Sequence, residues 1–498
     1  MNSSTGAKDP QPAYLAELPE QETLGRAEVA KGFAWNALFK VVFLVLQVVF
    51  IRKLGPTQTG IYAVLIPIYM ICESLRDAGL ALTYVADHKA HGRREGEYAS
   101  LAILNAAVFA TALYAGRFKI AEFLHLPQLD WGLQMVAAAI VVTGFSTIPA
   151  NKLQKKARFR DAGLVELVAT VVSYVVATIL VFTGFGFKAL IWQFLVKAFV
   201  FTIGCWTLEP IRPFWVRMEI IREIGKRSGH NLINNLLFTV YTVADNLMVS
   251  RLFGLLAVGN YNTAYSFGMK PVDFFSSPLG RTLLIAYTRK SHDLKALANL
   301  FTRTIAVSVL LMVPLYVLFG LFAHPIALLV FSKKFDMAGD LLAILVFYCF
   351  CRSIGLLCGN VLVAMNRPVL NVYGWLLAYA TVFSILLYNR EHLTLTTTVW
   401  ALTAGAAVVY LSNAVAAFSI LQPNGENALK LWRSLGMAAL ASVAIALASI
   451  MPFSVYVDLA LAALVVPLVY VVGISALYGG TPTALFSRSG LKKVWAAI

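Results

Sequence analysis

The chain has 498 residues, of which 59% are hydrophobic and 13% are charged, and its mean hydropathy is +0.73. A soluble domain carries about 25% charged residues, so this composition excludes a soluble protein and predicts a polytopic α-helical membrane protein. The net charge of +16 would suggest nucleic-acid binding in a soluble chain, but basic residues in a membrane protein first of all set the orientation of its loops. No nucleic-acid partner is therefore predicted.

The first 31 residues are polar and contain three prolines, with no basic segment leading into a short apolar run. They are predicted to form a cytoplasmic tail rather than a cleaved signal peptide. Apolar segments long enough to cross a membrane follow, and we predict about fourteen of them. They lie near 32–51, 60–85, 99–116, 131–150, 163–183, 188–208, 229–251, 259–286, 299–322, 339–365, 372–388, 394–421, 432–451 and 457–478.

The distribution of Lys and Arg tests this assignment. With the N-terminus inside, the inner segments hold nearly three times as many basic residues as the outer connections. Such an excess is expected for cytoplasmic loops, so it supports an even number of spans with both termini in the cytoplasm.

A turn near the start of the chain has a counterpart near its middle. Gly55–Tyr62 and Gly254–Tyr261 both read G-x-x-x-x-G-x-Y, and each follows a basic residue and a leucine. Six predicted spans separate the copies, and an even number preserves orientation, so the pattern predicts two parallel repeats with substrate bound between them.

The predicted architecture is therefore two six-helix lobes around a central cavity, plus two C-terminal helices. The tail is 1–31, and the N-lobe with the first six spans is 32–228. The C-lobe with the next six spans is 229–421, and the segment with the last two spans and a cytoplasmic C-terminus is 422–498.

Several motifs of catalysis are missing from the sequence. There is no G-x-x-x-x-G-K-[ST], no H-E-x-x-H, no nucleophile elbow and no spaced His/Cys cluster, and the five cysteines all fall in apolar stretches. No outer connection is long enough for a catalytic domain. The sequence thus favours a transporter over an enzyme, without catalytic residues, metal or cofactor.

Charged residues within the predicted spans carry the functional signal, because a charge at the centre of the bilayer costs at least about 2.5–3.5 kcal/mol. Basic residues there outnumber the acids, which favours an anionic cargo such as a diphosphate headgroup. The predicted substrate-binding residues are Lys40, Arg76, Lys270, Arg281 and Arg352. The predicted ion-coupling residues are Asp77, Asp245 and Asp273, since proton coupling would use a buried carboxylate.

Some of the charged residues within the predicted spans also have a structural explanation. Glu73 or Asp77 lies within one helical turn of Arg76 and could neutralise it as a structural pair. Lys197 and Arg303 could extend to the membrane interface, and Arg281 could bind lipid phosphate.

The turn R-K-L-G-P-x-x-x-G-x-Y and the segment Arg76–Leu80 (R-D-A-G-L) resemble bacterial polysaccharide and O-antigen flippases. These belong to the multidrug/oligosaccharidyl-lipid/polysaccharide exporter superfamily. The later A-D-N-L-M-V-S-R-L-F-G and G-N-Y-N-x-A-Y resemble the second half of the same family. The segment L-Q-K-K-A-R-F-R at Leu153–Arg160 is similar to its colanic-acid-exporter-like branch.

The resemblance implies a flippase that moves an undecaprenyl-diphosphate-linked oligosaccharide from the cytoplasmic to the periplasmic leaflet of the bacterial inner membrane. The unit would serve exopolysaccharide or O-antigen synthesis, and an ion gradient would drive alternating access. A polymerase and glycosyltransferases of the same pathway are the implied partners.

Two other functions compete with this interpretation. A cation-coupled multidrug exporter of the same superfamily should have an acidic cavity, which the surplus of interior cations disfavours. A membrane glycosyltransferase or polymerase would need a sizeable catalytic segment outside the membrane, and the predicted connections contain none.

Overall fold

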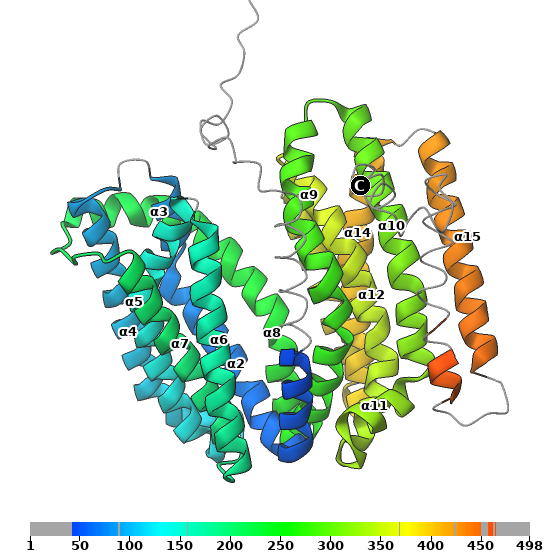
Figure 1. The fold of residues 1–498 in the computed structure, drawn as a ribbon, viewed down its shortest axis with the longest axis horizontal. Coiled ribbons are helices and arrows are strands. Elements are labelled where there is room, and N and C mark those ends of the chain that lie inside the picture. The colour runs from blue at the N-terminus through cyan, green and yellow to red at the C-terminus, as the bar shows by residue number, and fades with distance from the viewer. Residues whose placement is uncertain are drawn as a thin grey trace, which may run out of the picture. The chain divides into compact units, whose positions relative to one another are not determined.

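The computed structural model describes residues 42–87, 90–156, 158–367, 369–422, 425–449, 457–461 and 464. The chain divides into two units, Met1–Gln47 and Val48–Ile498, and all the elements described below belong to the second. The described residues form helices joined by turns and irregular segments, with no strand among them (Figure 1). This agrees with the predicted all-α membrane fold.

Residues 48–54 are helical, and the long helices follow them in chain order. They are α2 (Pro56–Asp77), α3 (Leu80–Ala86), α4 (Arg93–Phe123), α5 (Asp130–Lys155), α6 (Phe159–Phe182), α7 (Lys188–Leu208), α8 (Met218–Gly268), α9 (Ser277–Lys290), α10 (Leu294–Leu321), α11 (Ala323–Phe331), α12 (Asp336–Ala364), α13 (Val369–Tyr388), α14 (Leu395–Leu421) and α15 (Gly425–Ala448). Short 3₁₀ turns lie at Pro127–Leu129, Lys333–Phe335 and Arg390–His392, and a π-helical turn lies at Val272–Ser276.

Eleven helical segments among the described residues are long and apolar enough to cross a membrane. Helices suit this environment because every backbone polar group must find its hydrogen bond within the segment. Half of the predicted span 32–51 and most of the predicted span 457–478 lie outside the described residues, as do the tail 1–31 and the C-terminal end of the chain. The count of fourteen therefore stays a prediction.

Two predicted spans are not continuous helices. The predicted span 60–85 breaks between α2 and α3, where Ala78 and Gly79 adopt left-handed φ values of 47° and 74°. The predicted span 259–286 passes from α8 through the π-helical turn into α9. Broken helices at membrane depth are tolerated where the backbone is buried in protein or lines a cavity.

The first glycines of the two repeat turns have the same backbone conformation. Gly55 has φ 80° and ψ 173°, and Gly254 has φ 80° and ψ −175°. These values lie in a region that residues with a Cβ rarely adopt, so both copies of the turn require glycine. The repeat seen in the sequence is thus a repeat of backbone geometry.

The second glycines bring the two turns into contact. A Cβ on Gly60 would collide with the Leu255 carbonyl oxygen, and a Cβ on Gly259 would collide with the Pro56 carbonyl oxygen. Helices α2 and α8 pack extensively against each other around this point. Glycine at these positions therefore permits the closest backbone approach between the repeats.

The arginines that precede the two turns also occupy equivalent places in the repeat. Arg52 donates hydrogen bonds to the carbonyl oxygens of Leu329 and Val330 at the end of α11. Arg251 lies 2.8 Å (Nη1 to Nδ1) from His125, just after α4. Each arginine thus contacts a segment far from it in sequence, on the side predicted to face outward.

Further helix contacts complete the packing. Among the described helices, α4 packs against α5, α5 against α7 and α7 against α6, while α12 contacts α8, α9, α10, α11 and α14, and α10 contacts α15. A large apolar core runs from Ile61 and Val64 on α2 to Val258 on α8 and Leu342 on α12. The division into an N-lobe and a C-lobe at residues 228 and 229 stays a prediction.

Candidate functional site

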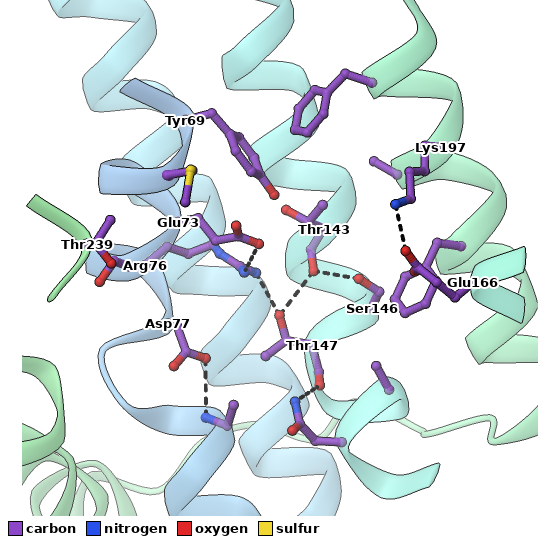
Figure 2. Close-up of a pocket in the computed structure, with 18 residues that line it drawn as sticks. Tyr69, Glu73, Arg76, Asp77, Thr143, Ser146, Thr147, Glu166, Lys197 and Thr239 are labelled. Atoms are coloured by element: carbon purple, nitrogen blue, oxygen red, sulfur yellow. Dashed lines mark hydrogen bonds and ion pairs between the residues drawn. The ribbon is translucent and has the colours of Figure 1, made fainter. Parts of the chain in front are cut away.

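A cavity of about 580 Å³ lies beside the break between α2 and α3 (Figure 2). Its walls come from α2, α3, α5, α6, α7 and α8, and both polar and apolar side chains line it. The polar or ionisable lining residues are Tyr69, Glu73, Ser74, Arg76, Asp77, Thr143, Ser146, Thr147, Asn151, Glu166, Lys197 and Thr239. A polar cavity bounded by membrane-spanning helices is where a transported solute would bind.

Arg76 is the most deeply placed charge in this cavity, with only 4% of its surface exposed. Its Nη1 donates to the Thr147 hydroxyl at 2.7 Å, and its Nη2 lies 3.5 Å from the Glu73 carboxylate. The Nε of Arg76 is buried without a hydrogen-bond partner. A buried guanidinium with an unused donor is a ready site for an additional acceptor, because leaving that donor unpaired costs free energy.

Asp77 combines a place in the cavity wall with a structural role. Its carboxylate accepts a hydrogen bond from the Ala81 backbone N–H at 3.2 Å, across the break between α2 and α3. The negative charge thereby satisfies a free N–H at the start of α3, where the helix dipole also favours it. Asp77 therefore holds the broken helix beside Arg76.

Lys197 and Glu166 lie on another part of the wall, from α7 and α6. Their ion pair measures 2.6 Å, and both side chains are about half exposed. The position of Lys197 in the sequence allowed it to extend to the membrane interface, but in the structure it pairs with Glu166 in the cavity (Figure 2). Their presence within predicted spans was the available signal; that they pair was not visible in the sequence.

The charge balance of the cavity differs from the predicted surplus of cations. Glu73, Asp77 and Glu166 supply three carboxylates, against the two cations Arg76 and Lys197. Each of these cations has a carboxylate within ion-pair distance. The sequence already placed Glu73 within one helical turn of Arg76, whereas the partner of Lys197 comes from a neighbouring helix.

Asp245 and Arg352 lie in a second cluster, formed by α8 and α12. The Asp245 carboxylate accepts a hydrogen bond of 2.7 Å from Tyr261, and Arg352 donates to the hydroxyls of Tyr265 and Tyr348 at 2.9 and 3.3 Å. The rings of Tyr261 and Tyr265 stack with their centroids 6.0 Å apart. Asp245 is 7% exposed, so this is a buried polar network.

Lys270 and Asp273 flank the start of the π-helical turn between α8 and α9. Lys270 is half-buried and Asp273 is exposed. The turn is joined to α12 by a hydrogen bond of 2.8 Å between the hydroxyls of Ser276 and Ser353. Single π-helical turns inside long helices often mark functional sites, since they redirect the following side chains.

The remaining predicted substrate-binding residues cannot be placed in either cluster. Lys40 lies outside the described residues, and so does the side chain of Arg281, whose backbone belongs to α9. Of the predicted set, the structure thus brings Arg76 and Asp77 together in one cavity and Asp245 and Arg352 together in another cluster. Among the described residues, no group of three or more His, Cys, Asp or Glu side chains could hold a metal ion.

A carboxylate that the sequence did not single out organises the predicted cytoplasmic end of these helices. Glu209, just after α7, lies 2.8 Å from Lys156 Nζ, 2.7 Å from Arg158 Nη1 and 3.5 Å from Lys152 Nζ. Partial burial alone would raise the pKa of Glu209, but the hydrogen bonds and charges of these basic residues hold it below its usual range.

The chain matches the family model described as "Polysaccharide biosynthesis protein" over residues 49–339. It is 20% identical to an uncharacterized membrane protein in the cps region of Klebsiella pneumoniae, over 78% of this chain and 80% of that protein. It is 23% identical to the amylovoran biosynthesis protein AmsL of Erwinia amylovora, over 52% of this chain and 68% of that protein. It is 22% identical to the probable low-salt glycan biosynthesis flippase Agl15 of Haloferax volcanii, over 68% of this chain and 70% of that protein.

Two solved structures share the fold at low sequence identity. The lipid II flippase MurJ, in an inward closed conformation, aligns with a TM-score of 0.74 at 12% identity, over 90% of this chain and 98% of that one. An inward-facing multidrug resistance MATE family transporter of the MOP superfamily aligns with a TM-score of 0.60 at 13% identity, over 76% and 93%. Both are transporters rather than enzymes, as the sequence predicted for this chain.

The family match covers more than half of the chain and agrees with the resemblance found in the sequence motifs. The helices long and apolar enough to span a membrane are those of a multi-pass membrane protein, and the fold is shared with MurJ. This chain belongs to the polysaccharide biosynthesis protein family.

Proposed function

We propose that this protein flips a lipid-linked oligosaccharide, carried on undecaprenyl diphosphate, from the cytoplasmic to the periplasmic leaflet. The repeat unit would then serve exopolysaccharide or O-antigen synthesis. Membership of a polysaccharide biosynthesis family and a fold shared with a lipid flippase support this cargo. The observation that carries the proposal is Arg76, a buried cation with an unused donor in the wall of a cavity.

The paired charges of the cavity suggest how an ion gradient could be coupled to this cargo. Glu73 lies 3.5 Å from Arg76, and Glu166 lies 2.6 Å from Lys197. When a carboxylate takes up a proton, its charge is cancelled and the neighbouring cation is free to bind a phosphate oxygen. Proton uptake and diphosphate binding would then favour each other within the same cavity.

The predicted coupling residues fit this scheme as places where a proton or metal cation could act. Asp77 lies in the cavity, Asp245 lies in the buried tyrosine network, and Asp273 lies within the π-helical turn. Lys270, Arg281, Arg352 and Lys40 stay candidates for diphosphate contacts at other stages of transport. The protein would work in the bacterial inner membrane with both termini in the cytoplasm, beside a polymerase and glycosyltransferases.

One observation favours a second function, a cation-coupled multidrug exporter. The cavity holds three carboxylates and two cations, which suits a cationic solute better than a surplus of cations would. A MATE family transporter also shares the fold. We rank this function second because the matched family is named for polysaccharide biosynthesis.

Transport by sealed inverted membrane vesicles tests the role of Arg76. Arg76→Gln keeps the polar contact with Thr147 but removes the charge, and it should lower the translocation of a lipid-diphosphate oligosaccharide at least tenfold, since a charge-assisted hydrogen bond contributes about 1.5–3 kcal/mol. Arg303→Gln, on α10 and away from the cavity lining, is the matched control and should transport normally. Normal transport by Arg76→Gln would remove Arg76 from the site, and extrusion of organic cations without lipid transport would favour the exporter.

A further inference from the structure

A second cavity, of about 540 Å³, lies on the other side of α2 from the cavity of Figure 2. The first cavity is lined by Tyr69 and Glu73 on α2, whereas the second is lined by Ile68, Ile71 and Cys72. Its other walls come from α4 with the residue that follows it, and from α8. One helix therefore separates a polar compartment from an apolar one.

The lining of this second cavity has two distinct parts. Of its eleven lining residues, nine are apolar and the other two are the cations Lys119 and Arg251. Lys119 lies one turn before the end of α4, and Arg251 lies three residues before the repeat turn at Gly254. The end of α4 and the kink of α8 at Gly254 both belong to the predicted outer side. The apolar part of the cavity therefore extends inward from the two cations toward Leu113 and Leu247.

The two cations stand at the mouth of the cavity. Both side chains are exposed, and the guanidinium of Arg251 lies over the ring of Phe123 at 5.7 Å from its centroid. Phe123 itself is 69% exposed, so the cavity opens to the surface at this edge. Arg251 uses one nitrogen toward His125, which leaves its other donors for a ligand, and Lys119 has no ion-pair partner among the described residues.

We propose that this cavity binds one anionic phospholipid of the outer leaflet, with an acyl chain in the apolar part and the phosphate group against Lys119 and Arg251. An apolar chain fits walls of Ile, Leu and Phe, and basic residues near the membrane surface attract anionic headgroups. A net negative headgroup such as phosphatidylglycerol matches two cations better than a zwitterionic one. This site does not depend on the cargo proposed above.

The position of the site gives the lipid a structural consequence. Arg251 contacts His125 and precedes the turn in which Gly259 meets Pro56. A lipid phosphate on Arg251 therefore binds at the contact between the repeats on the predicted outer side. Phosphatidylglycerol would stabilise the arrangement of α2, α4 and α8 seen here.

Native mass spectrometry of the full chain released from nanodiscs tests the proposal. The nanodiscs contain phosphatidylcholine with a graded fraction of phosphatidylglycerol. The wild type should retain one phosphatidylglycerol, and the double variant Lys119→Gln/Arg251→Gln should need at least tenfold more of it for equal retention. Lys53→Gln/Lys188→Gln removes two cations from the same predicted side but outside the cavity lining, and it should retain the lipid normally.

A second measurement needs no substitution, because Cys72 lies in the cavity wall. Labelling of Cys72 by a membrane-permeant maleimide should slow as the phosphatidylglycerol fraction rises, while labelling of the half-buried Cys351, which lies elsewhere, should not change. Equal retention by the wild type and the double variant, equal retention of phosphatidylcholine, or labelling of Cys72 that ignores the lipid would each overturn the proposal.

Discussion

Single residues decide how charge is held inside this protein. Arg76 is kept at depth by Thr147 and Glu73, and Asp245 is kept there by Tyr261. In both places an ionisable side chain is buried with a polar partner, as burial of such a group requires. The two sites differ in what they offer: Arg76 has an unused donor, whereas Asp245 is part of a tyrosine network.

Replacing Asp245 separates the role of its charge from that of its hydrogen bond. Asp245→Asn can still accept a hydrogen bond from Tyr261 but cannot bind a coupling cation or proton through a carboxylate. We expect gradient-driven transport to fall at least tenfold, while exchange of cargo between leaflets without a gradient persists. Parallel measurements of driven transport and exchange in proteoliposomes check this.

Tyr261→Phe is the matched control for the Asp245 variant. It removes the hydrogen bond and leaves the Asp245 carboxyl group in place, so it should lower the free energy of unfolding by about 1–3 kcal/mol and preserve coupling. Loss of coupling in Tyr261→Phe together with normal coupling in Asp245→Asn would show that the carboxylate is not the coupling group.

The residues of the candidate site were only partly predictable. Arg76 and Asp77 could be found because adjacent charges in a predicted span are costly and therefore rare. The pairing of Glu166 with Lys197 joins two helices, and the contacts of Glu209 join segments more than 50 residues apart. Such pairs depend on how the helices pack, which the helical period of one segment does not specify.

At the scale of elements, the segment after α7 is fastened to the helices before it. Glu209 pairs with Lys152, Lys156 and Arg158 at the end of α5, and Arg217, just before α8, pairs with Glu97 on α4 at 3.0 Å. The segment that joins the repeats is thereby fixed at both of its ends. Movements of α8 should start beyond this attachment.

Glu209→Gln tests the strength of this attachment. Because the variant loses hydrogen bonds between charged groups, we expect its free energy of unfolding to fall by about 1–3 kcal/mol, seen as a lower melting temperature in detergent. Glu122→Gln is the control, because it makes the same chemical change at a carboxylate on α4 that forms no ion pair among the described residues. A melting temperature equal to that of the wild type would show that the attachment does not stabilise the fold.

The stability that Glu209 contributes should depend on pH. The pKa of Glu209 lies below its usual range in the folded protein, so its stabilising contribution is fully present above the unfolded pKa of about 4.3 and is lost as pH falls through the lower folded value. The difference in melting temperature between wild type and Glu209→Gln should be constant from about pH 7 to pH 5 and should shrink below about pH 4. A difference that grows on acidification would contradict this assignment.

The contact between the repeat turns is a second element whose effect can be measured. Gly259→Ala places a Cβ against the Pro56 carbonyl oxygen and should hold the turns apart. We expect at least fivefold slower transport and faster labelling of Thr57→Cys by a membrane-impermeant maleimide, because the predicted outer side is then less closed. Gly116→Ala, whose Cβ would have only Ile120 at 4.0 Å, should behave as the wild type does. Normal labelling and transport in Gly259→Ala would show that this contact does not control opening.

The elements themselves were largely predictable, because apolar length and the need for internal hydrogen bonds fix where a helix can cross the membrane. The breaks were not. The left-handed residues Ala78 and Gly79 and the π-helical turn at Val272–Ser276 lie inside continuous apolar segments. Hydropathy records burial in lipid and carries no information on a local change of helix type.

At the scale of the whole molecule, the chain is a family member with a transporter fold and a polar cavity beside a broken helix. The G-x-x-x-x-G-x-Y motif predicts two repeats in the chain, and Gly55 and Gly254 of the two copies have the same backbone conformation. Under the proposed function the cavity would select the cargo, and its paired carboxylates and cations are compatible with either an anionic lipid or a cationic solute. Transport must distinguish the two.

The most direct measurement reconstitutes the purified protein in proteoliposomes and offers both cargoes under a proton or sodium gradient. A fluorescent undecaprenyl-diphosphate oligosaccharide reports flipping by its accessibility to an impermeant quencher, and an organic cation reports extrusion. We expect gradient-dependent flipping of the lipid and no transport of the cation. Transport of the cation with no movement of the lipid would contradict the proposed function.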